Sequence, residues 1–248
     1  MIFKEFGNDN KDIIILLHGG GLSWWNYKNE IELLKSKYHI ILPILNGHAG
    51  SDKSFISIED NADEIINFID EKFNGKIKLI GGLSLGGQIL LEILSKRNDI
   101  CEYALIESAN IIPSEFTNKL ISPIFSSSYG LIKNKTFSKL QFNSLHINKE
   151  LFDDYYKDTC LIKKEDMISF LKASTTYKLK DSINNIKTKT FIYIGDKENK
   201  SIKDSADIIN KTIPNSTKII LTNLYHGEFS LNNPILYVQE IDKILNNN

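Results

Sequence analysis

The sequence predicts an α/β protein: a mostly parallel central sheet with helices on both faces and a helical insertion. Short, continuous runs of Ile and Leu alternate along the chain with longer stretches whose apolar residues have helical spacing. This alternation is typical of a parallel sheet that is buried on both faces. The alternation stops between residues 110 and 185, where helical patterns continue and no clear strand is found. The chain is therefore divided into a core of residues 1–109 and 186–248 and an insertion of residues 110–185.

The strands are expected where buried apolar runs end at glycines or polar residues. Taken in order, they are 13–17 (IIILL), 39–45 (HIILPIL), 77–81, 103–106, 190–194 (TFIYI) and 218–222 (KIILT). Helices are expected at 24–36, 61–73, 88–96 and 234–245. The second of these shows the pattern well, because Ala62, Ile65, Ile66, Ile69 and Phe73 recur at helical spacing.

The insertion is too long for a structureless loop. Its helical patterns are Phe116, Leu120, Ile121 and Ile124, then Leu151, Tyr155 and Tyr156, then Met167, Phe170 and Leu171. An insertion between two strands of an open sheet is expected to lie over the carboxyl ends of the strands, where such sheets bind ligands.

Composition excludes several classes of protein. The 248 residues hold 30 Lys and Arg against 31 Asp and Glu, a net charge of −1, so no basic field for nucleic acid is expected. No apolar run approaches the length of about 18 residues that a membrane span needs. The N-terminus MIFKEFGNDNKD lacks a signal-peptide core, and two cysteines make no disulfide framework. We therefore expect a cytoplasmic protein, whose oligomeric state the sequence does not indicate.

The most specific motif is Gly82-Leu83-Ser84-Leu85-Gly86, which directly follows a predicted strand and precedes a predicted helix. G-x-S-x-G in this context places a serine in a tight turn with its hydroxyl exposed at the end of the sheet. Side chains two residues before and after the serine would collide in such a turn, which explains the two glycines. Ser84 is therefore the predicted nucleophile, although a glycine-rich turn that binds phosphate, or nothing, would share the pattern.

A serine nucleophile needs a base, and five histidines are available. His226 follows the last predicted strand and so lies at the carboxyl edge of the sheet, as Ser84 does. His39 lies at the opposite edge and His146 in the insertion, whereas His18 and His48 lie in glycine loops. His226 is the predicted base.

The base needs a carboxylate that orients it. Asp196 follows the strand TFIYI in Gly195-Asp196-Lys197-Glu198, again at the carboxyl edge. The chain order Ser84, Asp196, His226 is the order expected for a triad on a parallel sheet, so Asp196 is the predicted acid. Glu198 and Glu107 are the alternatives.

The loop His18-Gly19-Gly20-Gly21 follows the strand at 13–17. Backbone N–H groups of Gly20 and Leu85 are the predicted oxyanion hole, with Gly21 as a second candidate donor and substrate contact. The loop lacks the Lys-Ser/Thr of a phosphate-binding P-loop. His18 is expected to tie the loop down. No zinc pattern is found, and neither a metal nor a cofactor is expected.

Together these segments resemble the α/β-hydrolase fold superfamily over nearly the whole chain. The resemblance rests on LLHGGG at 16–21, NGHAGS at 46–51, GLSLGG at 82–87, IGD at 194–196 and YHG at 225–227. In the second of these, Ala49 replaces a glycine of the usual family segment. The resemblance implies a catalytic triad, a helical cap matching 110–185, and first strands that are short or partly missing here.

The predicted activity is hydrolysis of a small carboxylic ester or thioester through an acyl-enzyme. Trp24, Trp25 and Phe125 are candidate contacts for an apolar acyl group, while packing in the core is the alternative for both tryptophans. Two other classes stay open: different chemistry on the same triad (C–C bond hydrolysis, a lyase or an acyltransferase), and a non-catalytic receptor for a small molecule. Fold alone does not separate them.

Overall fold

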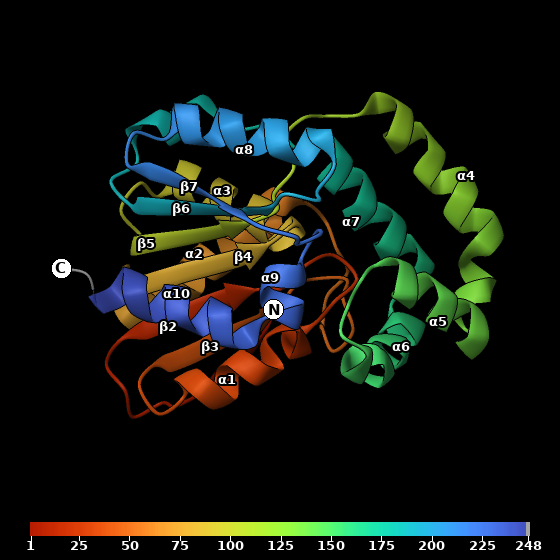
Figure 1. Cartoon of the computed structure of the whole chain (residues 1–248), viewed down its shortest axis with the longest axis horizontal. Helices are drawn as coiled ribbons and strands as arrows, with labels where there is room; N and C mark the ends of the chain where they lie inside the picture. Colours follow the sequence, from red (N-terminus) through yellow and green to blue (C-terminus); the bar gives the residue numbers. More distant parts are fainter. Residues whose placement is uncertain (247–248) are drawn as a thin grey trace.

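The computed structural model describes residues 1–246 and contains a seven-stranded sheet of order β1-β3-β2-β4-β5-β6-β7 (Figure 1). Its strands are β1 (Ile2–Phe6), β2 (Ile13–Leu17), β3 (His39–Ile44), β4 (Ile77–Leu83), β5 (Cys101–Glu107), β6 (Lys189–Gly195) and β7 (Ser216–Leu221). Only β1 is antiparallel to its neighbour, β3, and all the other pairs are parallel. The predicted fold class is confirmed.

Helices separate the strands along the chain. They are α1 (Lys28–Leu34), α2 (Ile58–Phe73), α3 (Leu85–Lys96), α4 (Glu115–Ile132), α5 (Lys135–Ser144), α6 (Phe152–Leu161), α7 (Lys164–Thr176), α8 (Lys200–Thr212), α9 (Glu228–Asn232) and α10 (Pro234–Asn246). Short 3-10 helices are η1 (Trp24–Tyr27), η2 (Lys149–Leu151) and η3 (Asp181–Asn185). No helix in residues 1–246 has both the length and the apolar character needed to cross a bilayer.

All six predicted strands are present, and their ends differ from the prediction by no more than two residues. The sequence analysis missed β1, whose residues IFKEF mix apolar and charged side chains and are only partly buried. β1 pairs with β3 from Ile2 opposite Ile44 to Phe6 opposite Ile40, at the edge of the sheet. An edge strand needs no continuous apolar run, which is why the pattern was not recognised.

Both faces of the sheet are buried because successive side chains of each strand point to opposite sides. On β4, Ile80 packs in a core with residues of α2, α3 and α8, whereas Leu79 packs with residues of α1 and α10. Both side chains are fully buried, and each such burial contributes about 1.5–3 kcal/mol. The two helical layers therefore hold the central strands rigidly.

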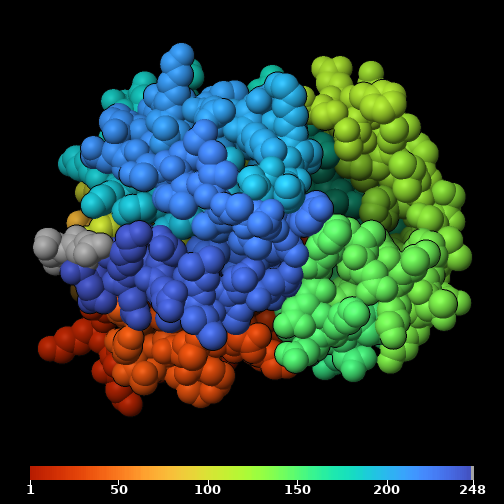
Figure 2. Space-filling view, viewed as in Figure 1, coloured from red at the N-terminus to blue at the C-terminus, as the bar shows by residue number. Residues whose placement is uncertain are grey.

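The six parallel strands end at one edge of the sheet, and the loops that follow them meet there. The helices α4 to α7 lie between β5 and β6 in the chain and beyond this edge in space (Figure 1). Among the described residues, 110–185 contain no strand. Figure 2 shows α4, α5 and α6 as a yellow-green and green lobe at this end of the molecule.

Candidate active site

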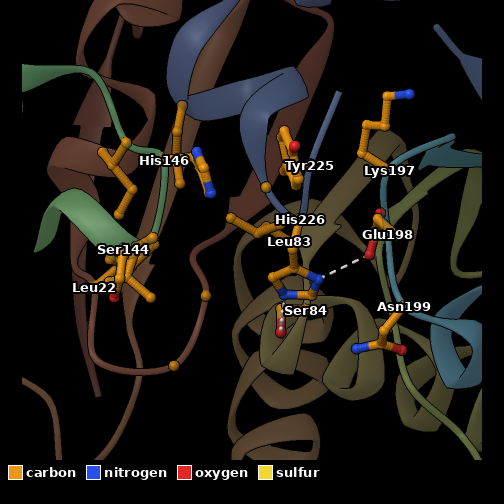
Figure 3. A pocket seen from close by; sticks show the side chains of 16 residues that line it. Leu22, Leu83, Ser84, Ser144, His146, Lys197, Glu198, Asn199, Tyr225 and His226 are labelled. Atoms are coloured by element: carbon orange, nitrogen blue, oxygen red, sulfur yellow. Dashed lines mark hydrogen bonds and ion pairs between the residues drawn. The ribbon is translucent and has the colours of Figure 1, made fainter. Parts of the chain in front are cut away.

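Ser84 lies in the sharp turn between β4 and α3. Its φ is 53° and its ψ is −110°, a conformation that costs a residue with a side chain about 1–3 kcal/mol. Its N–H donates a hydrogen bond of 2.8 Å to the carbonyl of Glu107, which anchors the turn to the end of β5. The turn presents the hydroxyl to a cavity at the carboxyl edge (Figure 3).

Close packing of this turn against β2 requires a glycine at position 86. A Cβ on Gly86 would lie 2.2 Å from the carbonyl oxygen of Leu17, and both atoms belong to the rigid centre of the fold. We expect Gly86→Ala to lower the free energy of unfolding by about 3 kcal/mol, at the upper end of overpacking costs. Urea unfolding measures this. Gly130→Ala in α4 is the matched control, because a Cβ at this position meets no atom within 4 Å. This substitution is expected to raise the free energy of unfolding by about 0.5–1 kcal/mol. Equal effects of the two substitutions would contradict the packing argument.

His226 lies in the loop after β7, one residue before Gly227, whose φ of 76° allows the turn into α9. His226 Nε2 is 3.1 Å from Ser84 Oγ, and His226 Nδ1 is 2.9 Å from Glu198 Oε2 (Figure 3). The Nδ1–H tautomer fits both contacts, because Nδ1 then donates to the carboxylate and Nε2 accepts from the hydroxyl. The structure therefore brings the predicted nucleophile and the predicted base together.

Glu198 is the carboxylate that contacts His226. Its side chain is fully buried, and Oε1 accepts hydrogen bonds from Ser108 Oγ at 2.5 Å and from the N–H of Gly195 at 3.2 Å. Three donors thus hold the carboxylate in one orientation. A buried carboxylate with such partners can hold an imidazole in one tautomer and stabilise its positive charge.

Asp196 does not contact His226, so the prediction that it orients the base is wrong in the structure. Asp196 Oδ1 instead accepts a hydrogen bond of 2.7 Å from the N–H of Asn223. A turn closed by the N–H of Glu198 on the carbonyl of Gly195 folds the chain back over the end of β6. This turn brings Glu198, one of the two alternatives, towards β5 and the imidazole.

Glu107, the other alternative, is buried at the end of β5 and does not contact the His226 ring directly. Its Oε1 accepts a hydrogen bond of 3.2 Å from the N–H of Ser230 in α9.

The two predicted oxyanion donors lie close to Ser84. Gly20 lines the cavity that contains Ser84, and a Cβ on Gly20 would lie 3.6 Å from the Leu85 side chain. Leu85 is the first residue of α3, where a backbone N–H has no carbonyl of its own helix to bind. Both N–H groups can therefore serve a negatively charged oxygen near Ser84.

His18 fixes the Gly20 loop, as expected. Its Nδ1–H donates to the carbonyl of Gly19 at 2.9 Å, and its Nε2 accepts from the N–H of Leu45 at 3.1 Å. Burial holds the pKa of His18 well below its usual value, so the ring is neutral and tethers the loop to the end of β3.

The cavity has a volume of about 370 Å³. Five apolar side chains contribute to its wall: Leu22, Leu83, Leu145, Ile147 and Leu231. The remaining lining residues are Gly19, Gly20, Ser84, Ser144, His146, Lys197, Glu198, Asn199, Tyr225, His226 and Gly227. Ser144 is the last residue of α5, and residues 145–147 follow it directly, so the insertion supplies one side of the cavity.

The predicted substrate contacts are not part of this wall. Trp25 is buried and its Nε1–H donates to Asp158 Oδ2 at 2.9 Å, while Trp24 lies beneath the ammonium of Lys4. Phe125 packs against the main core, and Gly21 stands in a turn with a φ of 76°. The alternative of core packing for the tryptophans is therefore the one that the structure supports.

The sequence analysis also missed a pair of aromatic rings at the cavity. His146, from the insertion, stacks on Tyr225, the neighbour of His226, with ring centroids 4.2 Å apart and planes 5° apart. The side chain of Asn232 in α9 donates a hydrogen bond of 2.6 Å to the carbonyl of His146. These contacts attach the insertion to the loop that carries His226, and no sequence pattern links residues so far apart.

Within the described part of the chain, no three His, Cys, Asp or Glu side chains form a group suited to hold a metal ion.

Known proteins resemble this chain in sequence and in fold. A family described as alpha/beta hydrolase fold matches residues 12–230. AB hydrolase superfamily protein YfhM of Bacillus subtilis is 28% identical over 124 residues, which are 48% of this chain and only 42% of that protein. Lipase 1 of Psychrobacter immobilis is 23% identical over 238 residues, covering 91% of this chain and 74% of the lipase.

Two solved esterase structures share the fold. One is from Exiguobacterium antarcticum, with a TM-score of 0.82, 15% identity, and coverage of 98% of this chain and 94% of the esterase. The other is from Thermogutta terrifontis, with a TM-score of 0.79, 19% identity, and coverage of 98% and 92%. The family match spans most of the chain, and the motifs that carry the resemblance lie within it. The chain belongs to the α/β-hydrolase fold family.

Proposed function

We propose that this protein is a serine hydrolase that cleaves a small carboxylic ester or thioester through an acyl-enzyme. The observation that carries the proposal is the continuous contact from Ser84 Oγ to His226 Nε2, 3.1 Å, and from His226 Nδ1 to Glu198 Oε2, 2.9 Å. The esterases and the lipase among its relatives agree with this reaction class.

In the proposed mechanism, Ser84 Oγ attacks the substrate carbonyl while its proton passes to His226 Nε2. Glu198 holds the imidazole and stabilises its positive charge. The N–H groups of Gly20 and Leu85 stabilise the oxyanion, and each such donor is worth about 10²–10³ in rate. His226 then protonates the leaving group, and a water activated by the same ring releases the acid from Ser84.

The cavity supports a small substrate with an apolar acyl group. Its volume of about 370 Å³ is near the lower end of the range of about 300–1,000 Å³ for small-molecule sites. The leucines and Ile147 in its wall offer apolar contact beside Ser84. We also propose that residues 110–185 act as a cap, because the segment 144–147 closes one side of this cavity.

Labelling with a fluorophosphonate, followed by peptide mass spectrometry, tests the nucleophile. We expect an adduct on Ser84 of the wild-type protein and none in Ser84→Ala. The absence of an adduct on folded wild-type protein would contradict the proposal and favour a receptor or a specialised reaction.

Aryl esters that differ only in the acyl group test the substrate class. We expect kcat/KM to be highest for short apolar acyl groups and to fall at least tenfold for charged groups of equal size, because the wall next to Ser84 is apolar. Equal rates for charged, polar and apolar acyl groups would remove the basis of this assignment.

A further inference from the structure

Three loops of the candidate site are joined behind the cavity by buried side chains. The N–H of Gly19 donates to Asn26 Oδ1 at 3.3 Å, and Asn26 Nδ2 donates to Ser230 Oγ at 3.4 Å. The N–H of Ser230 donates to Glu107 Oε1 at 3.2 Å. Asn26, Ser230 and Glu107 are each at most 2% exposed. This chain of contacts links the loop of the proposed oxyanion hole, the helix that follows His226, and the strand that anchors Ser84.

Glu107 is the one ionisable residue in this series of hydrogen bonds. Its carbonyl holds the N–H of Ser84, so the residue fixes the nucleophile through its backbone and α9 through its side chain. Its second carboxyl oxygen, Oε2, is buried and has no hydrogen-bond partner in residues 1–246. A carboxyl group in such a place is costly to ionise, and the mechanism above does not use it.

Burial affects several ionisable groups around Glu107. It raises the pKa values of Glu30, Tyr27 and Tyr237 well above their usual ranges. Burial also raises the pKa of Glu107, but hydrogen bonding from Ser230 opposes this rise and the pKa is about 7. The charge of Glu198 raises this pKa further, whereas protonated His226 lowers it. The pKa of Glu107 therefore lies in the range where an imidazole base operates.

We propose that Glu107 is a positioning residue for His226, which orients the base through Ser230 and α9 and places a second negative charge behind the imidazole. This inference rests on the proposed function, since it assigns Glu107 a task in the same reaction. Attraction between two charges is mutual, so the ionised carboxylate stabilises the imidazolium that forms when Ser84 loses its proton.

The sign of the effect follows from this attraction. Replacing the Glu107 carboxylate by an uncharged amide removes this attraction and destabilises the imidazolium in the transition state. In Glu107→Gln, the acid limb of the kcat/KM profile is therefore expected to move down by about one pH unit. The plateau kcat is expected to fall about tenfold, which is the rate equivalent of the same free energy. A purely structural lesion would lower kcat and leave the acid limb in place.

The experiment compares pH profiles of aryl-ester hydrolysis for the wild type, Glu107→Gln and Glu30→Gln. Glu30 is the matched control: it is 1% exposed, both its carboxyl oxygens lack partners in the described chain, and no contact joins it to Ser230. We expect Glu30→Gln to leave the acid limb unchanged. An unshifted limb in Glu107→Gln, or equal shifts in both variants, would overturn the inference.

A second measurement needs no substitution. Because protons on His226 and Glu107 influence each other, the acid limb of the wild type is expected to extend over a wider pH range than a single ionisation gives. A limb with the shape of one ionisation would count against the proposal even if Glu107→Gln did not fold.

Fluorophosphonate labelling at Ser84 distinguishes failure of the Glu107 proposal from failure of the hydrolase proposal. Labelling with identical pH dependence in wild type and Glu107→Gln leaves the hydrolase proposal intact and removes the role of Glu107, whereas no labelling removes both.

Discussion

Ser84→Ala is expected to lower kcat for aryl-ester hydrolysis by about 10⁶-fold, the loss typical when a serine nucleophile is removed. The alanine leaves His226 without the hydroxyl that its Nε2 contacts at 3.1 Å, so no covalent intermediate can form. The measurement is steady-state kinetics with purified variant, together with urea unfolding to show that the fold is retained.

The cavity offers a matched control for this substitution. Ser144 also lines the cavity, but its hydroxyl donates to the carbonyl of Gln141 at 2.6 Å rather than to a base. Ser144→Ala is expected to change kcat by less than about threefold, as for a side chain outside the reacting centre. Comparable losses in both variants, or more than about 1% activity left in Ser84→Ala, would contradict the assignment of the nucleophile.

Glu198→Gln is expected to lower kcat by about 10³–10⁴-fold. The amide is nearly isosteric, but it carries no charge to stabilise the imidazolium. It can also turn its NH₂ group towards Nδ1 and favour the tautomer with the proton on Nε2, which cannot accept the proton of Ser84. Kinetics and fluorophosphonate labelling of the same sample measure the effect, and both are expected to fall together.

Asp196→Asn is the matched control for the acid. Its Oδ1 accepts from the N–H of Asn223, a contact that an asparagine oxygen keeps, so kcat is expected to stay within about threefold of the wild type. A large loss in Asp196→Asn with little change in Glu198→Gln would reverse the assignment and restore the carboxylate that chain order alone favoured.

The contrast between these two carboxylates shows where sequence reasoning reaches its limit. Parallel strands end at one edge, so the sequence could predict that Ser84 and His226 meet there. Both Asp196 and Glu198 follow β6 at that edge, and the choice between them depends on how the chain turns. A Cβ on Gly195 would lie 1.9 Å from the carbonyl oxygen of Leu224, so the loop after β7 crosses directly over this turn. No local pattern encodes a contact between segments so far apart.

The same reasoning applies to the wall of the cavity. The helices of the insertion follow from apolar spacing, but the burial of their apolar residues does not: α7 buries Met167 and Phe170, whereas Phe116 in α4 is 75% exposed. Which of their residues reach Ser84 depends on how the helices pack on the core. Trp25 follows the glycine loop that lines the cavity, yet its ring donates a hydrogen bond to Asp158 in α6. His146, from a polar stretch of the insertion, lines the cavity instead. Periodicity predicts a helix and does not predict which of its residues face a ligand.

The position of the base in the chain has a consequence for biosynthesis. His226 lies 142 residues after Ser84, on a loop that follows the edge strand β7. During synthesis on the ribosome, the serine and its turn emerge long before the imidazole that contacts the serine. A nascent chain, or a product truncated before β7, therefore carries Ser84 without this imidazole, and the contact forms only when β7 has joined the sheet. Any activity that needs both side chains thus requires synthesis at least as far as residue 226.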